Sequence, residues 1–297
     1  TLESSLIPPE WDKALNAYYT KEFFPRLQKN LSPETLNPSV YIPTGQASRY
    51  LQYYYIASNP NPVGKKNKLF DAGDGSIYSQ AHAKYQPLFA EIIEKFGYYD
   101  LFLINHKTGD IIYSYFKETD FATSRLQGFY SDSTLTNLVQ RVQANPTKGS
   151  IQVADFKPYR PSYNGPAAFL ATPIYSGSNM IGILAVQIPI DKMNQAINRN
   201  NNWEASGLQK TGEAYLVGPD SLMRSISRFW LEDAKKYQNV VRDKGTDQRT
   251  LELMESFNTT IRLQKINSKA AQAALEGEQG MMVTRNYRGA EVLSSYS

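Results

Sequence analysis

The chain has 297 residues, of which 41% are hydrophobic and 20% are charged. This length suits two domains, and the composition is that of a soluble folded protein, which argues against disorder. The net charge of +4 is too small to indicate the clustered basic face that nucleic-acid binding needs. The absence of cysteine excludes disulfides, thiolate catalysis and zinc–thiolate sites.

The N-terminal quarter is predicted to form helices followed by a loop. Aromatic and aliphatic residues recur at helical spacing through most of Pro9–Ser58, with a second helix expected over Gly45–Ala57. The following run, Asn59–Lys66, contains two prolines and Gly64. Proline removes a backbone donor that a helix needs, so the helices are expected to end before this loop.

A helix and a β-hairpin follow the loop. Apolar residues at amphipathic spacing predict a helix that begins at Ser76 or Ser79 and ends before Gly97, which is a typical C-terminal stop. β-Branched and aromatic runs then flank a Gly-containing turn. This pattern predicts a hairpin whose strands are Leu101–Asn105 and Asp110–Lys117.

The next stretch is predicted to complete an antiparallel sheet. We expect a helix at Ser133–Ala144, a strand at Gly149–Phe156 and a Pro- and Tyr-rich loop at Lys157–Gly165. Pro166–Tyr175 and Met180–Ile190 then form a second hairpin around a polar turn. The order helix, two strands, helix and three strands predicts an α+β module of the PAS type, with helices on one face of an antiparallel sheet.

The remaining residues are predicted to repeat strand pairs on a smaller scale. Asn198–Asn202 is polar and is interpreted as the linker. Thr211–Val217 with Leu222–Ser227 predicts one hairpin, and Gly280–Tyr287 with Ala290–Tyr296 predicts another. The chain does not begin with Met, ends inside a predicted strand and contains no apolar run of the roughly 20 residues that span a bilayer. We therefore expect a soluble fragment of a longer protein.

The sequence carries no recognisable catalytic or metal-binding motif. Only two histidines occur, His82 in a predicted helix and His106 in a predicted turn. The usual nucleophile, metal and phosphate signatures are missing together, so we expect no enzymatic activity, no bound metal and no cofactor. A hydrolase that uses a carboxylate pair is the remaining enzymatic alternative, because carboxylates are plentiful but show no pattern.

Binding is the function that the residues favour. Side chains alternate along a strand, so two tyrosines and a lysine of Asp110–Lys117 are expected to share one face. The loop that follows the third strand adds tyrosines, a carboxylate and a guanidinium. The candidate ligand-binding residues are Tyr113, Tyr115, Lys117, Asp155, Tyr159, Arg160 and Tyr163. Aromatic walls with both charges suit a small zwitterion or organic acid. In the alternative interpretation, the tyrosines only pack the loop onto the sheet.

The sequence resembles the double Cache family, the tandem PAS-like extracytoplasmic sensor domains of bacterial histidine kinases, chemoreceptors and nucleotide cyclases. The resemblance covers most of the chain, and the TGEAYLVGPDSLMRS segment is its most specific part. The segments that carry it are Leu51–Lys66, Tyr98–Thr123, Pro166–Asn194, Thr211–Phe229 and Tyr287–Ser297.

The resemblance implies a function and an arrangement of parts. It implies an N-terminal helical stalk and loop (1–75), a membrane-distal ligand-binding module (76–197) and a membrane-proximal module truncated at its C-terminus (198–297). Flanking transmembrane helices, absent from this chain, would anchor this periplasmic part in the inner membrane and connect it to a cytoplasmic kinase, cyclase or chemotaxis output.

The same resemblance implies the partners. The ligand would be an amino acid, organic acid or amine, the chain could form a homodimer, and nucleic acid would not be a partner. Arg160 is followed by Pro161, not by the Trp-Tyr pair of amino-acid-binding members, so the ligand class stays open. The alternative function is a protein-interaction or dimerisation module without a small-molecule ligand.

Overall fold

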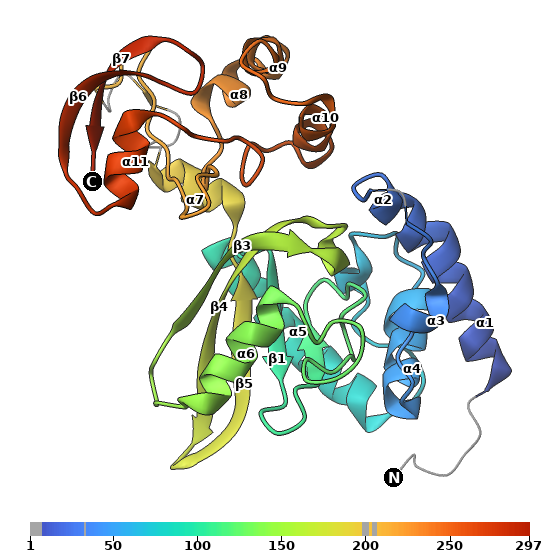
Figure 1. Cartoon of the computed structure of the whole chain (residues 1–297). Helices are drawn as coiled ribbons and strands as arrows, with labels where there is room; N and C mark the ends of the chain where they lie inside the picture. Colours follow the sequence, from blue (N-terminus) through green and yellow to red (C-terminus); the bar gives the residue numbers. More distant parts are fainter. Residues whose placement is uncertain (1–7, 33, 198–201, 204–206) are drawn as a thin grey trace. The chain divides into compact units, whose positions relative to one another are not determined.

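The structure is a computed structural model that describes residues 8–32, 34–197, 202–203 and 207–297. The chain divides into two compact units, 1–189 and 190–297. Helices and antiparallel strands occur in both, so the predicted α+β class is confirmed (Figure 1).

The first unit is built on a five-stranded antiparallel sheet with the order β2-β1-β5-β4-β3. Its strands are β1 (Asp100–Ile104), β2 (Ile111–Ser114), β3 (Gln152–Tyr159), β4 (Gly165–Ser176) and β5 (Asn179–Gln187). Both predicted hairpins are confirmed, as β1–β2 and β4–β5. Gly109, with φ +70°, closes the first hairpin in the left-handed conformation that glycine adopts most easily.

A β-bulge at Ile112 overturns the predicted alternation of side chains along the second strand. Leu103 pairs with Tyr113, whereas the next residue, Ile104, pairs with Ile111, so the register shifts at this point. The extra residue turns Ile111 and Tyr113 to opposite faces of the sheet, and Ile112 is 47% exposed. β2 also ends at Ser114, three residues before the predicted end.

β3 extends further than predicted. It was expected to end at Phe156, with a loop from Lys157, but the strand continues through Pro158 to Tyr159. β3 is an edge strand, where a proline is tolerated because its missing N–H need not join the sheet. A single 3₁₀ turn, η4 (Arg160–Ser162), then reverses the chain.

Helices cover both faces of this sheet. α5 (Ile77–Phe96) begins at Ser76, whose hydroxyl accepts the Ser79 N–H, and ends at the left-handed Gly97, as predicted. It packs on the face that carries Leu101, Tyr113 and Val186. α6 (Thr134–Ala144) lies on the other face, in front of the strands in Figure 1, and buries its leucines and valines against Phe102 and Phe169. Both predicted helices are confirmed, but the expectation that helices lie on one face is wrong, because α5 and α6 pack on opposite faces of the sheet.

The N-terminal helices belong to the same compact unit. They are α1 (Pro9–Tyr18), η1 (Tyr19–Phe23), α2 (Phe24–Gln28), α3 (Pro38–Tyr41), α4 (Gln46–Gln52) and η2 (Tyr53–Ala57), followed by the 3₁₀ turn η3 (Lys66–Lys68). η1 and η2 are π-helical turns that continue α1 and α4. Leu15 and Tyr55 join the core on the α6 side. The Gln52 amide donates to the carbonyls of Thr119 at 3.0 Å and Phe121 at 2.8 Å, so these helices are bonded to the chain that leaves β2.

The second unit is mostly helical. Its elements are α7 (Ile190–Ile197), α8 (Arg228–Glu232), α9 (Ala234–Arg242), α10 (Gln248–Phe257), α11 (Lys269–Leu275), β6 (Gly280–Arg285) and β7 (Glu291–Tyr296). β6 and β7 pair antiparallel, which confirms the last predicted hairpin. The part of the chain that the structure describes contains no helix long and apolar enough to cross a membrane.

The hairpin predicted at 211–217 and 222–227 forms only near its turn. Val217 and Met223 pair as an isolated bridge. The Gly218 N–H donates to the Leu222 carbonyl at 2.9 Å, and the Arg224 N–H donates to the Leu216 carbonyl at 2.7 Å. On its other edge Met223 bonds a third segment, because its N–H donates to the Gln264 carbonyl at 2.9 Å and its carbonyl accepts the Arg262 N–H at 2.8 Å.

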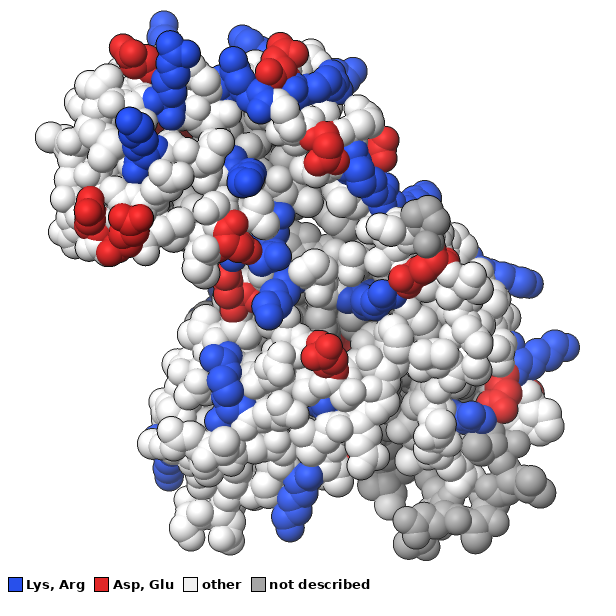
Figure 2. Space-filling view, viewed as in Figure 1, with Lys and Arg blue, Asp and Glu red and all other residues white. Residues whose placement is uncertain are grey.

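Charged side chains of both signs are interspersed over the visible face of each unit (Figure 2). This distribution agrees with the small net charge of +4.

Candidate ligand site

Tyr113 and Tyr115 lie under α5. Both are buried in the apolar cluster that contains Ile93 and Val186. The Tyr113 hydroxyl donates to the Gln86 Oε1 atom of α5 at 2.5 Å. The bulge thus places these two tyrosines on the opposite face of the sheet from α6, and neither joins the loop residues with which they were grouped.

Asp155 and Arg160 lie apart from each other. Asp155 is exposed on β3, and its carboxylate accepts the Phe156 N–H at 2.7 Å. The Arg160 guanidinium forms an ion pair with Glu34 at 2.6 Å and donates to the Tyr41 hydroxyl at 2.9 Å. The hydrogen bond from Arg160 lowers the pKa of Glu34. Arg160 is therefore occupied by the N-terminal segment.

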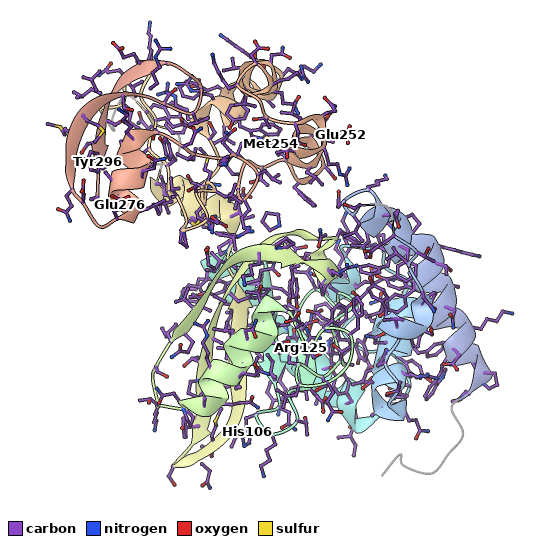
Figure 3. The ribbon with its side chains drawn as sticks, in the orientation of Figure 1. His106, Arg125, Glu252, Met254, Glu276 and Tyr296 are labelled. Atoms are coloured by element: carbon purple, nitrogen blue, oxygen red, sulfur yellow. The ribbon has the colours of Figure 1, made fainter. Side chains whose placement is uncertain are left out.

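Tyr159 leads to a buried pair of opposite charges that the sequence analysis did not single out. Its hydroxyl donates to Oδ2 of Asp120, which is fully buried. Arg125 is also fully buried, and its guanidinium lies 5.1 Å from the centre of the Tyr130 ring. Figure 3 shows Arg125 in the interior of the first unit. Asp120, Arg125, Tyr130 and Tyr159 are called the Arg125 cluster below.

Several buried polar atoms of the Arg125 cluster have no hydrogen-bond partner. Arg125 donates through Nη2 to the Thr123 hydroxyl, but its Nε and Nη1 atoms have no acceptor. Oδ1 of Asp120 likewise has no donor. A buried guanidinium without acceptors costs more free energy than an apolar side chain, and buried polar groups in native proteins are almost always hydrogen-bonded. The cluster therefore has the donors and the acceptor to bind a small polar molecule.

Burial sets the electrostatics of this pair. It raises the pKa of Asp120 above its usual value, while the nearby Arg125 guanidinium and the Tyr159 hydroxyl act in the opposite direction. An anionic group within reach of the unpaired Nε and Nη1 atoms of Arg125 would form charge-assisted hydrogen bonds. A donor group of the same molecule would form a hydrogen bond with the Oδ1 atom of Asp120.

The chain after β2 folds back on that strand, and this fold positions the cluster. Lys117 and Ala122 adopt left-handed φ values of 58° and 59°. The Ile111 N–H then donates to the Thr123 carbonyl at 3.0 Å, and the Ile111 carbonyl accepts the Ala122 N–H at 3.0 Å. The Arg125 N–H donates to the Gly109 carbonyl at 2.8 Å. This pairing directs both charged side chains inward.

The sequence contained one signal for this site. Asp120 and Arg125 are the only charges in the stretch Asp120–Tyr130. A charge pair in a stretch of small and aromatic residues is a candidate for burial, since exposed loops usually carry more polar residues.

A cavity of about 320 Å³ lies beside the cluster, and two of the predicted residues, Lys117 and Tyr163, line it. Its walls come from the N-terminal helices, the loop around Gly64, the chain after β2 and the turn after β3. Thr119 separates it from the cluster, because Thr119 lines the cavity and its hydroxyl bonds the Tyr130 hydroxyl at 2.8 Å. The predicted residues are therefore divided among the α5 face, the Arg125 cluster, the surface and this cavity.

Comparisons with known proteins identify extracytoplasmic sensor domains. No family model and no curated protein matches the chain. The extracellular domain of the putative histidine kinase vpHK1S-Z8 is similar with a TM-score of 0.39 and 10% identity, over 74% of each chain. The periplasmic sensory domain of the Campylobacter jejuni chemoreceptor Tlp1 gives 0.38 and 13%, over 78% of each chain. An extracellular ligand binding receptor from Desulfohalobium retbaense gives 0.34 and 12%, over 73% of this chain and 31% of its own.

Proposed function

We propose that the chain is the extracytoplasmic sensory part of a transmembrane signalling protein and that its first unit binds a small molecule bearing a carboxylate at the Arg125 cluster. In this proposal, 76–197 is the membrane-distal module with the stalk 1–75 packed against it, and 198–297 is the membrane-proximal module. The chain itself catalyses no reaction. The observation that carries the proposal is the buried Arg125, whose Nε and Nη1 atoms have no acceptor.

The chemistry of the cluster selects the ligand class. Nε and one Nη of a guanidinium form a fork that matches the two oxygens of a carboxylate. The opposite charge in the cluster is that of Asp120, whose Oδ1 atom has no donor and can accept a hydrogen bond from the ligand. An amino acid or a hydroxy acid carries both complementary groups, whereas an amine without a carboxylate leaves Arg125 unpaired. The Tyr130 ring against the guanidinium adds an apolar wall.

The fold suggests how binding would be transmitted. Asp120 lies between two residues whose carbonyls accept from Gln52 of α4, namely Thr119 and Phe121. A ligand that bonds Asp120 and Arg125 would therefore fix the segment to which the N-terminal helices are attached. Binding would favour one arrangement of helices and sheet over another by its differential affinity for the two.

A ligand screen with a matched pair of variants tests this proposal. Amino acids, hydroxy acids, dicarboxylates and polyamines are each added to the intact chain, and the melting temperature is measured. We expect an acid to raise it, because a ligand at a hundred times its Kd stabilises the folded state by about 2.7 kcal/mol. Arg125→Met should abolish the shift, and Arg242→Met, which alters an exposed arginine of α9, should retain it.

The outcomes separate the interpretations. A polyamine that stabilises the chain while all acids fail contradicts the role of Arg125. An acid whose shift survives Arg125→Met shows that it binds elsewhere. If no compound of the panel shifts the melting temperature, the proposal fails and the protein-interaction alternative is favoured.

A further inference from the structure

The cavity beside the Arg125 cluster is a site in its own right. Its volume of about 320 Å³ is within the lower range of small-molecule pockets, roughly 300–1,000 Å³. Since one water takes about 30 Å³ of liquid, there is room for on the order of ten non-hydrogen atoms. Thr119 lines this space, whereas Asp120, Arg125, Tyr130 and Tyr159 do not.

Three cationic residues line the cavity, namely Arg26, Lys66 and Lys117. Arg26 is paired with Glu22 at 2.9 Å. Nζ of Lys117 donates to the Ser114 carbonyl and lies 4.1 Å from the centre of the Tyr113 ring, which is not part of the cavity wall. Lys66 is 7% exposed, and its Nζ donates to the Asn59 carbonyl at 2.7 Å. An ammonium has three N–H donors, and among the residues that the structure describes Lys66 takes part in no ion pair.

The rest of the wall is aromatic on several sides. Tyr18 and Phe23 come from the N-terminal helices, Tyr99 and Phe116 from the first hairpin, and Tyr163 from the turn after β3. The single lining carboxylate, Glu118, accepts hydroxyl hydrogen bonds from Tyr99 at 2.9 Å and Ser162 at 2.8 Å. A buried ammonium without an ion-pair partner, flat apolar walls and a carboxylate already held by hydroxyls match an anion with an apolar body.

We propose that this cavity is a second ligand site, separate from the Arg125 cluster, that binds a small monocarboxylate with an aromatic body. The carboxylate bonds Lys66, and the ring lies between the tyrosines. Because the walls belong to the N-terminal helices and to the sheet edge together, the occupant joins these parts of the first unit.

The titration of the cavity wall supports this assignment. Burial together with Asp120 raises the pKa of Glu118 to about 7. Protonation of Glu118 as the pH falls through 7 removes a negative charge from the wall, which favours an anion.

The other ionisable groups around the cavity do not reverse that sign. Burial lowers the pKa of Lys66 from its usual value, so this lysine does not lose charge as the pH falls. The groups that face Glu118 include Tyr99, Asp120 and Tyr163, whose pKa values are all raised and which therefore bring no new charge as the pH falls below 7. Affinity for an anion should thus decrease as the pH rises through 7.

Calorimetry with benzoate and the isosteric benzyl alcohol tests the proposal on the intact chain. Benzoate should bind, and more tightly at pH 6 than at pH 8, a comparison set by the pKa of about 7 for Glu118; benzyl alcohol should bind at least tenfold more weakly. Lys66→Met should weaken benzoate about tenfold to a hundredfold, since one charge-assisted hydrogen bond contributes about 1.5–3 kcal/mol.

Val63→Trp, on the loop that lines the cavity, should also weaken benzoate by filling the space, without removing a charge. It keeps the test valid if Lys66→Met fails to fold. Arg125→Met should leave the benzoate affinity unchanged, which separates this site from the proposed sensory site. Absence of benzoate binding, or binding that Arg125→Met removes while Val63→Trp does not, overturns the proposal.

Discussion

Tyr159→Phe should reveal how much the Arg125 cluster depends on its one hydroxyl donor to a carboxylate. The substitution deletes the hydroxyl that donates to Oδ2 of Asp120 and keeps the ring, which is 1% exposed. Oδ1 of Asp120 already has no donor. The variant therefore leaves both side-chain oxygens of a buried acid without a side-chain partner.

The loss in the free energy of unfolding depends on the charge of Asp120. A hydrogen bond to a charged group contributes about 1.5–3 kcal/mol and one between neutral groups about 0.5–1.5 kcal/mol. Burial raises the pKa of Asp120, so the folded state binds this proton more tightly than the unfolded state. That stabilisation is present below the unfolded pKa and is lost as the pH rises through the folded pKa.

Tyr159→Phe removes an interaction that lowers the Asp120 pKa, so its cost should grow from acid toward neutral pH. The free energy of unfolding, measured by urea denaturation between about pH 4 and pH 8, should show a loss of about 0.5–1.5 kcal/mol at the acid end and about 1.5–3 kcal/mol at neutral pH. Tyr130→Phe is the matched control, because its hydroxyl meets the neutral Thr119 hydroxyl.

The control should cost about 0.5–1.5 kcal/mol at every pH. Two results would refute the reasoning. One is a Tyr159→Phe cost that does not change with pH, and the other is a pH dependence of the same size in Tyr130→Phe. Either would show that Asp120 carries no charge that the Tyr159 hydroxyl stabilises.

Two further predictions concern the hairpin turn and the surface ion pair. Gly109→Ala should destabilise the protein by about 1–3 kcal/mol more than Gly128→Ala, because both have positive φ but only at Gly109 would the new Cβ lie 2.7 Å from Leu126 Cγ; equal urea midpoints would contradict this. A double-mutant cycle on Arg160 and Glu34 should give a coupling below about 1 kcal/mol that shrinks with salt, since both side chains are about a third exposed. Arg160→Ala should also leave any ligand-induced shift of the melting temperature intact. If the variant abolishes that shift, Arg160 belongs to the ligand site.

Local patterns predicted the elements whose determinants are local. The cap at Ser76 and the stop at Gly97 gave α5 its ends because capping depends only on neighbouring residues. The hairpins β1–β2 and β4–β5 were predicted for the same reason. The prediction of side-chain orientation failed at Ile112, which forms a β-bulge, because periodicity does not show an unpaired residue.

The site needed information that lies far along the chain. Asp120 is a buried acid because Tyr159, 39 residues away, covers it with a hydroxyl. Lys117 and Tyr163 both line one cavity, but its other walls include N-terminal helices that the sequence did not place there. The hairpin expected before Ser227 is reduced to a bridge between Val217 and Met223, and the segment around Gln264, far along the chain, pairs with the other edge of Met223.

The cavity walls have a consequence for the order in which the protein folds. The Asn30 side chain donates to the Tyr163 carbonyl across 133 residues, and Arg160 reaches Glu34 across 126. Closing such long loops costs entropy before any contact repays it, and structures rich in distant contacts fold slowly. During synthesis, the first helices therefore emerge well before the strands they rest on, and we expect them to stay loosely structured until β3 is complete. The cavity is then among the last features to form, which makes it the natural place for a ligand to act as a late folding template.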